Sequence, residues 1–339
     1  MLQEILIFTK NLRVDTASYT SLFNSYLEKN INFKTPVNLY DPIRYIMSIG
    51  GKRIRPSLAL MSCDLFDTDP NSALDVALTI EMFHNFTLIH DDIMDKADLR
   101  RGKETVHKKW DLNTGILSGD ALMILAYQRL NSYPERTFKQ LMELFTQTAI
   151  EVCEGQQMDI DFESRTEVEL QEYYTMITYK TAVLLGCSLQ MGSIVAEAKI
   201  PDQKEIYSFG MNLGLAFQLQ DDYLDTFGGD GFGKRIGGDI IENKKTFLYI
   251  RTLELAEPKD QNRLLELYGN TVPNSENEEN QKIEEVRNLF VKCGVDQFLL
   301  EEIKDYTERA LANIEQLNVK DSKKDLLRQF SMALMNRKI

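Results

Sequence analysis

Residues 77–95 read ALTIEMFHNFTLIHDDIMD, and residues 209–225 read FGMNLGLAFQLQDDYLD. Both stretches are apolar runs with helical periodicity, and each ends in an aspartate pair that is followed three residues later by a third aspartate. On a helix, positions i and i+4 lie on one face, so each cluster presents two carboxylates in the same direction. Because like charges at this spacing repel one another, folding does not require them. We therefore expect two buried helices whose carboxylates face a cation.

The two clusters indicate a magnesium site. Mg²⁺ takes oxygen ligands and is commonly held by one or two carboxylates together with the phosphate oxygens of a substrate. A single DDxxD would be just as typical of a solvated helix end, since acidic residues are mostly exposed. Two clusters of identical spacing, Asp91–Asp95 and Asp221–Asp225, both follow apolar segments, and this repetition favours the metal site.

The composition is that of an ordinary globular protein, with 339 residues, 43% of them hydrophobic and 27% charged. A net charge of −13 argues against nucleic acid or an anionic membrane as a partner. No stretch approaches the roughly 20 apolar residues of a membrane span, so we expect no stable membrane insertion. The four cysteines are scattered without a CxxC pair, which is typical of reduced, buried thiols in a cytoplasmic protein: Cys63, Cys153, Cys187 and Cys293.

Helical periodicity dominates the chain and predicts a single all-α domain over residues 1–339, a bundle of ten or more helices. The eight prolines fall mainly at boundaries between helix-sized segments. We expect one helix to begin at Asp41-Pro42, with proline at its first position, and to end at Gly50-Gly51. Residues 271–281 are rich in asparagine and glutamate and are predicted to form a solvated loop.

Cations gather at several places in this acidic chain. Residues 51–56, GKRIRP, hold three cations in four positions, which is more than helix capping needs and suits a phosphate group. Residues 100–103, RRGK, form a second basic run in a predicted polar turn. Lys180 interrupts an apolar helix expected over residues 176–196. A buried lysine there requires an anionic partner, unless its side chain extends to the surface.

A glycine-rich segment follows the second aspartate cluster, with GGDGFGKR at residues 228–235 and GGD at 237–239. Its spacing fits neither a P-loop nor a dinucleotide-binding fingerprint, and no strand is predicted before it. We interpret it as a flexible lid that carries Lys234 and Lys244 toward the metals.

Together these motifs resemble the trans-isoprenyl diphosphate synthases, the family of farnesyl and geranylgeranyl diphosphate synthases. The resemblance covers about residues 40 to 250 and rests on GKRIRP at 51–56, LIHDDIMD at 88–95, RRG at 100–102, Gly119-Asp120, Lys180-Thr181 and FQLQDDYLD at 217–225. It implies an all-α bundle around a central active-site cavity, as a homodimer. It also implies a short-chain prenyltransferase that condenses isopentenyl diphosphate with an allylic diphosphate.

The resemblance further implies three Mg²⁺ ions and a role for each site residue. The expected direct metal ligands are Asp91, Asp95 and Asp221. The residues expected to shape the metal site or to hold metal-bound water are Asp92, Asp222 and Asp225. The residues that resemble those binding the allylic diphosphate in this family are Arg100, Lys180, Thr181, Gln218, Lys234 and Lys244. Those that resemble the isopentenyl diphosphate site are Lys52, Arg55, His84 and Arg101. The residues expected to carry catalysis are Asp91, Asp92, Asp95, Lys180, Asp221 and Lys234.

Product length in this family depends on the residues four and five positions before the first cluster, here Thr87 and Phe86. One aromatic residue and no insertion in the cluster favour geranylgeranyl diphosphate, with farnesyl diphosphate the close alternative. On an ideal helix, at roughly 100° per residue, Thr87 points near Asp91 whereas Phe86 points away from it.

Other classes of protein remain open at this point. A class I terpene cyclase also ionises a diphosphate at DDxxD, but it typically replaces the second aspartate cluster with an Asn/Ser/Glu motif and needs no basic site such as Lys52–Arg55. The same basic motif disfavours a head-to-head prenyl coupling enzyme. A non-catalytic subunit of a heteromeric prenyl synthase usually loses aspartates from one cluster, and this chain keeps all six.

Overall fold

The computed structural model describes residues 17–31, 35–229, 236–269 and 275–335, and these are helical almost throughout. This confirms the all-α fold class. The chain forms two compact units, one of residues 1–147, 187–207 and 318–323, and the other of residues 148–186, 208–317 and 324–339. The single domain expected over residues 1–339 stays a prediction.

The first unit holds most of the N-terminal elements. These are a helix over residues 17–30, α2 (Val37–Ser48), α3 (Ile54–Leu65), η1 (Pro70–Ala73), α4 (Leu74–Met94), β1 (Leu99–Arg100), β2 (Lys103–Glu104), α5 (Val106–Lys109), α6 (Leu112–Arg129) and η2 (Leu130–Ser132). Four helices contribute residues to both units: α7 (Glu135–Ser164), α9 (Val183–Val195), α10 (Ile200–Phe227) and α16 (Asp321–Met335).

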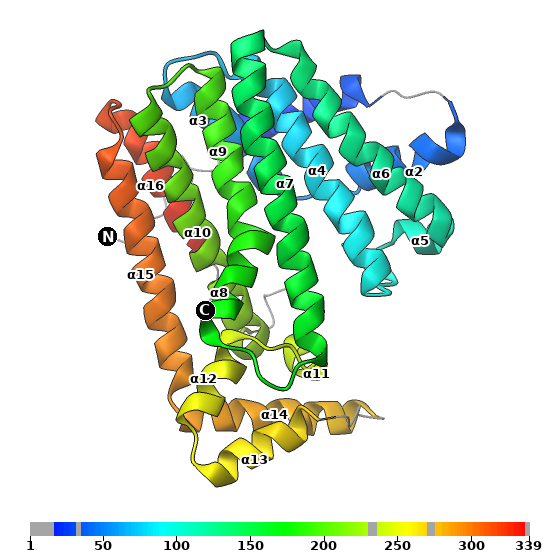
Figure 1. Cartoon of the computed structure of the whole chain (residues 1–339), viewed down its shortest axis with the longest axis vertical. Helices are drawn as coiled ribbons and strands as arrows, with labels where there is room; N and C mark the ends of the chain where they lie inside the picture. The colour runs from blue at the N-terminus through cyan, green and yellow to red at the C-terminus, as the bar shows by residue number, and fades with distance from the viewer. Residues whose placement is uncertain (1–16, 32–34, 230–235, 270–274, 336–339) are drawn as a thin grey trace. The chain divides into compact units, whose positions relative to one another are not determined.

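Helix α4 forms the centre of the first unit. It is apolar on nearly all sides, and Ile80, Met82 and Phe83 are fully buried, as expected of a helix without a polar face. It packs along α6 and against α3 (Figure 1). Each large apolar side chain buried in this way contributes about 1.5–3 kcal/mol. The packing therefore holds the end of α4, where the first aspartate cluster lies, in a fixed position within this unit.

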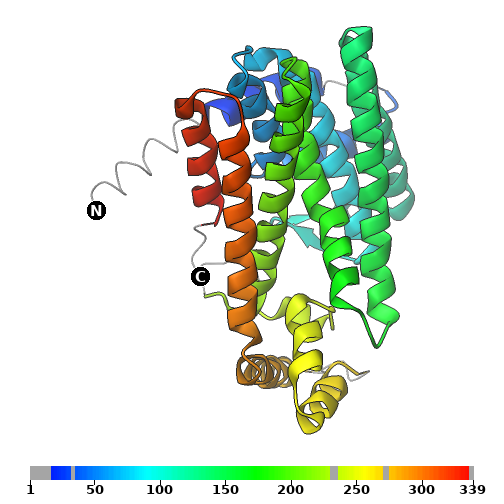
Figure 2. The same ribbon diagram turned by 60° about the vertical axis from the view of Figure 1, so that its left-hand side comes forward.

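The second unit contains the remaining helices. They are α8 (Leu170–Ile177), the π-helix η3 (Thr178–Ala182), α11 (Gly238–Ile241), α12 (Phe247–Leu255), α13 (Pro258–Leu267), α14 (Glu276–Lys292) and α15 (Val295–Gln316). Its core includes the buried rings of Tyr173, Tyr249 and Phe290. The long helix α15, orange in Figure 2, packs against α12 and α14.

Helix α2 begins earlier than the sequence predicts. It starts at Val37, and the proline expected at its first position, Pro42, lies inside it. An interior proline removes a hydrogen bond and costs about 3 kcal/mol. Here the burial of the apolar face that includes Pro42, Ile43 and Met47 outweighs that local cost. The predicted end is confirmed, because α2 stops at Ser48 and the next glycine, Gly50, has a φ of 89°.

The solvated loop predicted for residues 271–281 is wrong for its second half. Residues 271–274 lie outside the described ranges, but residues 276–281 form the first turns of α14. Ser275 caps this helix by accepting a hydrogen bond from the Glu278 N–H, and the acidic residues of the first turn are favoured by the helix dipole. A polar sequence that looks like a loop is here a capped helix start.

The basic run at residues 100–103 forms a hairpin rather than a bare turn. Arg100 pairs with Lys103 in an antiparallel register, and the two turn residues, Arg101 and Gly102, have φ of 53° and 75°. Positive φ at both central residues is typical of the tightest hairpin turns. The predicted polar turn is confirmed. The two flanking strands were not predicted, because a strand of two residues is too short to show an alternating pattern of apolar and polar residues.

Cys63 and Cys187 are buried free thiols, but the expectation of burial is wrong for Cys153, which is exposed, and for Cys293, which is half-buried. Helix α7 turns the neighbouring Val152 inward and leaves Cys153 exposed. Within the described residues, no helix combines the length and apolar character that a membrane span needs.

Candidate active site

The first aspartate cluster lies at the end of α4. Asp91 and Asp92 belong to its last turn, and Asp95 is the C-cap residue. The backbone N–H of Asp95 donates to the Asp91 carbonyl over 2.8 Å, so the helical relation between these two residues holds to the end of the helix. Asp92 is buried, whereas Asp95 is exposed. The helix places Asp91 and Asp95 one turn apart, as the spacing predicts.

Arg100 from strand β1 neutralises the buried Asp92. Its Nη2 atom lies 2.7 Å from one carboxylate oxygen of Asp92, and its Nε atom donates to both oxygens. A bidentate arginine–carboxylate pair is the geometry in which a guanidinium is most firmly held. The hairpin thus fixes the cluster from the side. The expected role of Arg100 toward the allylic diphosphate stays a prediction.

Arginine side chains surround His84, which lies two turns before Asp91 on α4. Arg55 Nη1 lies 3.4 Å from His84 Nε2. Burial lowers the pKa of His84 well below its ordinary value, and the nearby guanidinium groups lower it further: Arg55, Arg101, Arg100 and Arg53. His84 is therefore neutral at physiological pH, and its Nε2 atom can accept from Arg55.

The positive charge of this arginine cluster exceeds what its own carboxylates balance. Burial lowers the pKa of Arg55 to about 10, and the charge of Arg101 adds to that effect. The Arg55 Nε–H is buried and donates to no acceptor in the described part of the chain. Since an unpaired buried donor costs about 1–3 kcal/mol, this group suits an anionic ligand. The Arg101 guanidinium lies so close to Gly51 that a side-chain carbon there would be 2.5 Å from its Nη1 atom. The hairpin thereby brings Arg101 next to the residue before Lys52.

The pair of Arg53 and Glu81 belongs to the same cluster and is missed by sequence reasoning. Both side chains are almost fully buried and form an ion pair. Arg53 also donates to the Met47 carbonyl over 2.6 Å, and Asn85 donates to Glu81 over 3.1 Å. Arg53 is thus tied to the protein itself and not available to a ligand. One signal was present, because Glu81 is the single acidic residue in the apolar run of residues 77–90.

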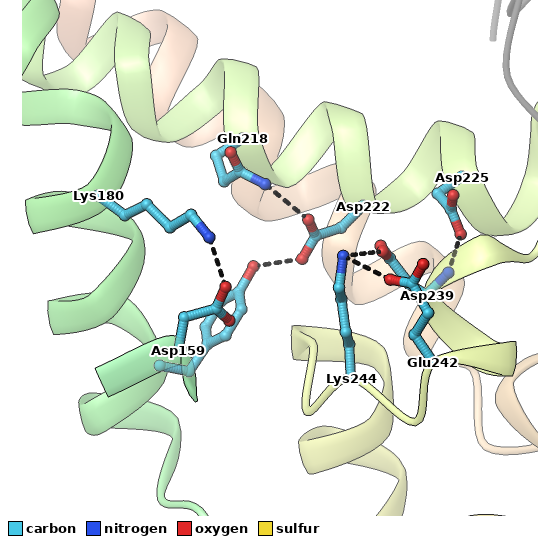
Figure 3. A network of polar contacts seen from close by, with 9 residues as sticks. Asp159, Lys180, Gln218, Asp222, Asp225, Asp239, Glu242 and Lys244 are labelled. Carbon is cyan, nitrogen blue, oxygen red and sulfur yellow. Dashed lines mark hydrogen bonds and ion pairs between the residues drawn. The ribbon is translucent and has the colours of Figure 1, made fainter. Parts of the chain in front are cut away.

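The second aspartate cluster lies near the end of α10 in the second unit, where Asp222 is buried (Figure 3). Tyr173 donates to one of its carboxylate oxygens over 2.6 Å, and Gln218 donates to the other over 3.0 Å. Burial raises the pKa of Asp222 to about 8, with the Asp239 carboxylate adding to the rise and the two hydrogen bonds opposing it. Tyr173 is a further residue that the sequence analysis did not select.

Lys180 and Thr181 lie in the π-helix η3 between α8 and α9. The Lys180 ammonium group is 2.5 Å from Asp159, and its side chain is 33% exposed, so the lysine is paired and still reaches solvent (Figure 3). Thr181 donates to the Gln218 side-chain oxygen over 3.0 Å. The sequence predicts that Lys180 interrupts an apolar helix, and in the structure this interruption is a π-helical turn between the α-helices α8 and α9.

Lys244 and Asp225 are held by the segment around α11 (Figure 3). Lys244 lies 3.2 Å from Asp239 and 2.9 Å from Glu242. Burial opposes the charged form of Lys244, but these two carboxylates outweigh it and raise the pKa of the lysine. Asp225 accepts the Asp239 N–H over 2.9 Å.

The structure therefore brings several predicted residues of the second unit to one pocket of about 100 Å³. The predicted residues that line it are Lys180, Thr181, Gln218, Asp222 and Lys244. Lys234, the remaining predicted lysine of this set, lies outside the described residues.

Metal ligation is not preorganised as a carboxylate cage in either cluster. Among the described residues, no group of three or more histidine, cysteine or acidic side chains is arranged to hold a metal ion. Mg²⁺ does not need such a cage, because it keeps water ligands and binds one or two carboxylates together with substrate phosphates. Asp91 is half-buried and Asp95 is exposed, so both carboxylates are accessible to a hydrated ion and fit that mode of binding.

Phe86 and Thr87 lie on different faces of α4, as the helix geometry predicts. Phe86 is almost fully buried. The centroid of its ring lies 5.5 Å from the ring centroid of Phe83 and 4.7 Å from that of His90. Thr87 is half-buried and donates to the His84 carbonyl over 2.8 Å. Their expected effect on product length stays a prediction.

Comparison with known proteins identifies the family. The family model described as polyprenyl synthetase matches residues 36–287 of the chain. The chain belongs to the polyprenyl synthetase family. A short chain isoprenyl diphosphate synthase of Methanothermobacter thermautotrophicus is 33% identical over 310 residues, which cover 91% of this chain and 93% of that protein. A geranylgeranyl pyrophosphate synthase of Geoglobus acetivorans is 34% identical, with 90% and 93% covered. A crystal structure of geranylgeranyl pyrophosphate synthase is 48% identical, with a TM-score of 0.92 over 96% of this chain and 99% of that one.

Membership in the polyprenyl synthetase family confirms the resemblance drawn from the sequence motifs. It also confirms the enzyme class, because the members are prenyltransferases. The structural likeness extends over nearly the whole chain and confirms the helical fold of the family.

Proposed function

We propose that this polyprenyl synthetase condenses isopentenyl diphosphate with an allylic diphosphate and releases pyrophosphate. The proposal combines the two aspartate clusters, which suit a metal-bound diphosphate, with a separate basic cluster that suits a second anion. It is supported by relatives that are named as short-chain and geranylgeranyl diphosphate synthases.

The arginine cluster around His84 is the observation that carries the proposal. It presents Arg55, with an unpaired buried Nε–H, beside a neutral histidine and Arg101. A terpene cyclase acts on one diphosphate and has no use for a second basic site. A non-catalytic subunit has no use for two complete aspartate clusters. A prenyl diphosphate synthase requires both the basic site and the two aspartate clusters.

In this mechanism the allylic diphosphate is held by the aspartate clusters and by cations of the second unit. Asp91, Asp95 and Asp221 are the proposed ligands of three magnesium ions, which when bound stabilise the charge that develops on the leaving pyrophosphate. Lys180 and Lys244 add positive charge at the same diphosphate. Burial and the Asp239 carboxylate raise the pKa of Asp222, and bound cations would lower it again by favouring the carboxylate. The allylic C–O bond then breaks to leave a delocalised cation.

The second substrate is bound by the arginine cluster. Lys52, Arg55 and Arg101 hold the isopentenyl diphosphate, and neutral His84 can donate its Nδ1–H because its Nε2 accepts from Arg55. The isopentenyl double bond attacks the allylic cation to form the new C–C bond. A proton is then lost to the departing pyrophosphate, which restores a double bond and completes the condensation.

The proposed product is geranylgeranyl diphosphate, with farnesyl diphosphate as the alternative. The proposal rests on a single aromatic residue, Phe86, beside the smaller Thr87, and on relatives that are named geranylgeranyl diphosphate synthases.

The enzyme is also proposed to be a homodimer. Exposed apolar side chains on α6 support this proposal, since Leu117 and Ile124 are 60% and 64% exposed. The cytoplasmic location stays a prediction.

Pyrophosphate release with and without isopentenyl diphosphate separates the two candidate chemistries. The enzyme is incubated with Mg²⁺ and geranyl or farnesyl diphosphate, and released pyrophosphate is measured. We expect release to depend on added isopentenyl diphosphate. Rapid release without it, together with hydrocarbon or alcohol products, would instead establish a cyclase.

A further inference from the structure

The two side chains proposed to grip the allylic diphosphate in the second unit, Lys180 and Thr181, lie in a π-helical turn, Thr178–Ala182. A π-turn inserts an extra residue into a helix and can kink it, and such turns occur frequently at functional sites. Here the turn leads Lys180 to Asp159 on α7 and Thr181 to Gln218 on α10. Both partners therefore come from helices that pack against the turn.

Helix α7 meets the turn at a glycine. A side-chain carbon on Gly155 would lie 2.4 Å from the backbone nitrogen of Lys180 and 2.8 Å from the backbone carbonyl carbon of Tyr179. These are backbone atoms, which cannot rotate away as a flexible side chain would. Gly155 precedes Asp159 by one helical turn, so the close approach occurs next to the partner of Lys180.

Helix α10 meets the turn at a second glycine. A side-chain carbon on Gly214 would lie 2.7 Å from the Cα atom of Ala182 and 2.9 Å from its Cβ atom. Gly214 precedes Gln218 by one helical turn, so this contact lies next to the partner of Thr181. The two helices thus repeat one arrangement, a glycine at the contact followed by a polar partner one turn later.

Glycine inside a helix destabilises it relative to alanine, so two interior glycines require a packing reason. We propose that Gly155 and Gly214 are positioning residues for Lys180 and Thr181. Their missing side chains let α7 and α10 approach the π-turn closely enough for the Lys180–Asp159 and Thr181–Gln218 contacts. This proposal rests on the proposed function for the identity of the anion that Lys180 and Thr181 bind.

The test measures binding of inorganic pyrophosphate in the presence of Mg²⁺ by calorimetry, together with the melting temperature of each variant. We expect Gly155→Ala and Gly214→Ala each to weaken pyrophosphate binding by about 10-fold or more, because small displacements at a binding site have effects of this size. Gly192→Ala is the matched control. It is a helical glycine whose added carbon would lie 2.2 Å from the Ala59 carbonyl oxygen, and both of these residues belong to the first unit, whereas the π-turn belongs to the second. It should lower the melting temperature and leave pyrophosphate affinity unchanged.

A Lys180→Met, Thr181→Val background separates positioning from general damage. If the glycines act by placing these two side chains, Gly155→Ala should cause no further loss of affinity in that background. An additive loss there would overturn the proposal, as would unchanged affinity in the single variants. Should Gly155→Ala fail to fold by circular dichroism, Gly214→Ala supplies the same comparison. Wild-type protein that binds no pyrophosphate with Mg²⁺ would refute the proposed function, whereas a normal wild type with unaffected variants would refute the positioning role alone.

Discussion

Arg100 places its Nε atom 2.8 Å from one carboxylate oxygen of Asp92 and 2.9 Å from the other. The Asp92 side chain is 1% exposed, so its negative charge has little water to stabilise it. The guanidinium is the countercharge that permits an aspartate at this position. The pair links the hairpin to the end of α4 and so to the first aspartate cluster.

We predict that Arg100→Met lowers the free energy of unfolding by about 3 kcal/mol, because it leaves a buried carboxylate without a partner. The measurement is urea denaturation in the absence of magnesium. The double variant Asp92→Asn, Arg100→Met serves as the control and should lose less stability than Arg100→Met alone. Equal losses in the two variants would mean that the ion pair is not what holds this turn.

The raised pKa of Asp222, about 8, makes stability depend on pH. An unfolded aspartate titrates near pH 4, so between about pH 4 and about pH 8 the folded protein holds one more proton than the unfolded chain. The stability that Asp222 contributes is fully present below its pKa in the unfolded chain, and it is lost as the pH rises through its pKa in the folded protein. We predict that, without metal, Asp222→Asn loses less stability than wild type between about pH 5 and about pH 8. Parallel stability profiles would contradict a raised pKa.

His84 should stay unprotonated under mildly acidic conditions, because burial and its arginine neighbours lower its pKa. The protein has three histidines, so its imidazole resonances can be assigned by substitution. We predict that the resonance lost in His84→Gln shows no titration between about pH 7.5 and about pH 5.5, against an ordinary pKa near 6.5. A midpoint inside that interval would show that the arginine cluster does not act on His84 as described.

We expect substitutions of Thr87 to change product length. Thr87→Phe should shorten the main product by at least one isoprene unit, because the half-buried side chain would gain a ring near the first aspartate cluster. Thr87→Ser keeps the hydroxyl that donates to the His84 carbonyl and should leave the product unchanged. Products are sized by chromatography after dephosphorylation. The same product from Thr87→Phe as from wild type would remove this residue from the growing-chain path.

The helices and both aspartate clusters could be predicted from the sequence because their signals are local. Periodicity reveals a buried helix such as α4, and the i, i+4 spacing of Asp91 and Asp95 follows from helix geometry alone. The start of α2 could not be placed, because the burial of Pro42 that overrides its local preference depends on tertiary packing.

The partners of the buried charges could not be predicted, because they join residues far apart in the chain. Tyr173 and Asp222 are 49 positions apart, and Arg53 and Glu81 are 28 apart. Neither pair carries a local spacing rule. A lone acidic residue in an apolar run, such as Glu81, needs a partner, but only the packing of α3 against α4 identifies that partner as Arg53.

Incorporation of isotopically labelled isopentenyl diphosphate tests the central claim most directly. The enzyme is incubated with Mg²⁺, the labelled substrate and, in separate reactions, dimethylallyl, geranyl or farnesyl diphosphate, and the prenyl products are sized. Wild type should place label in a longer prenyl diphosphate with at least one allylic partner, whereas Asp91→Ala and Asp221→Ala should lose activity by orders of magnitude with helical content intact. No labelled prenyl product with any allylic partner, or near-normal activity in either variant, would contradict the account.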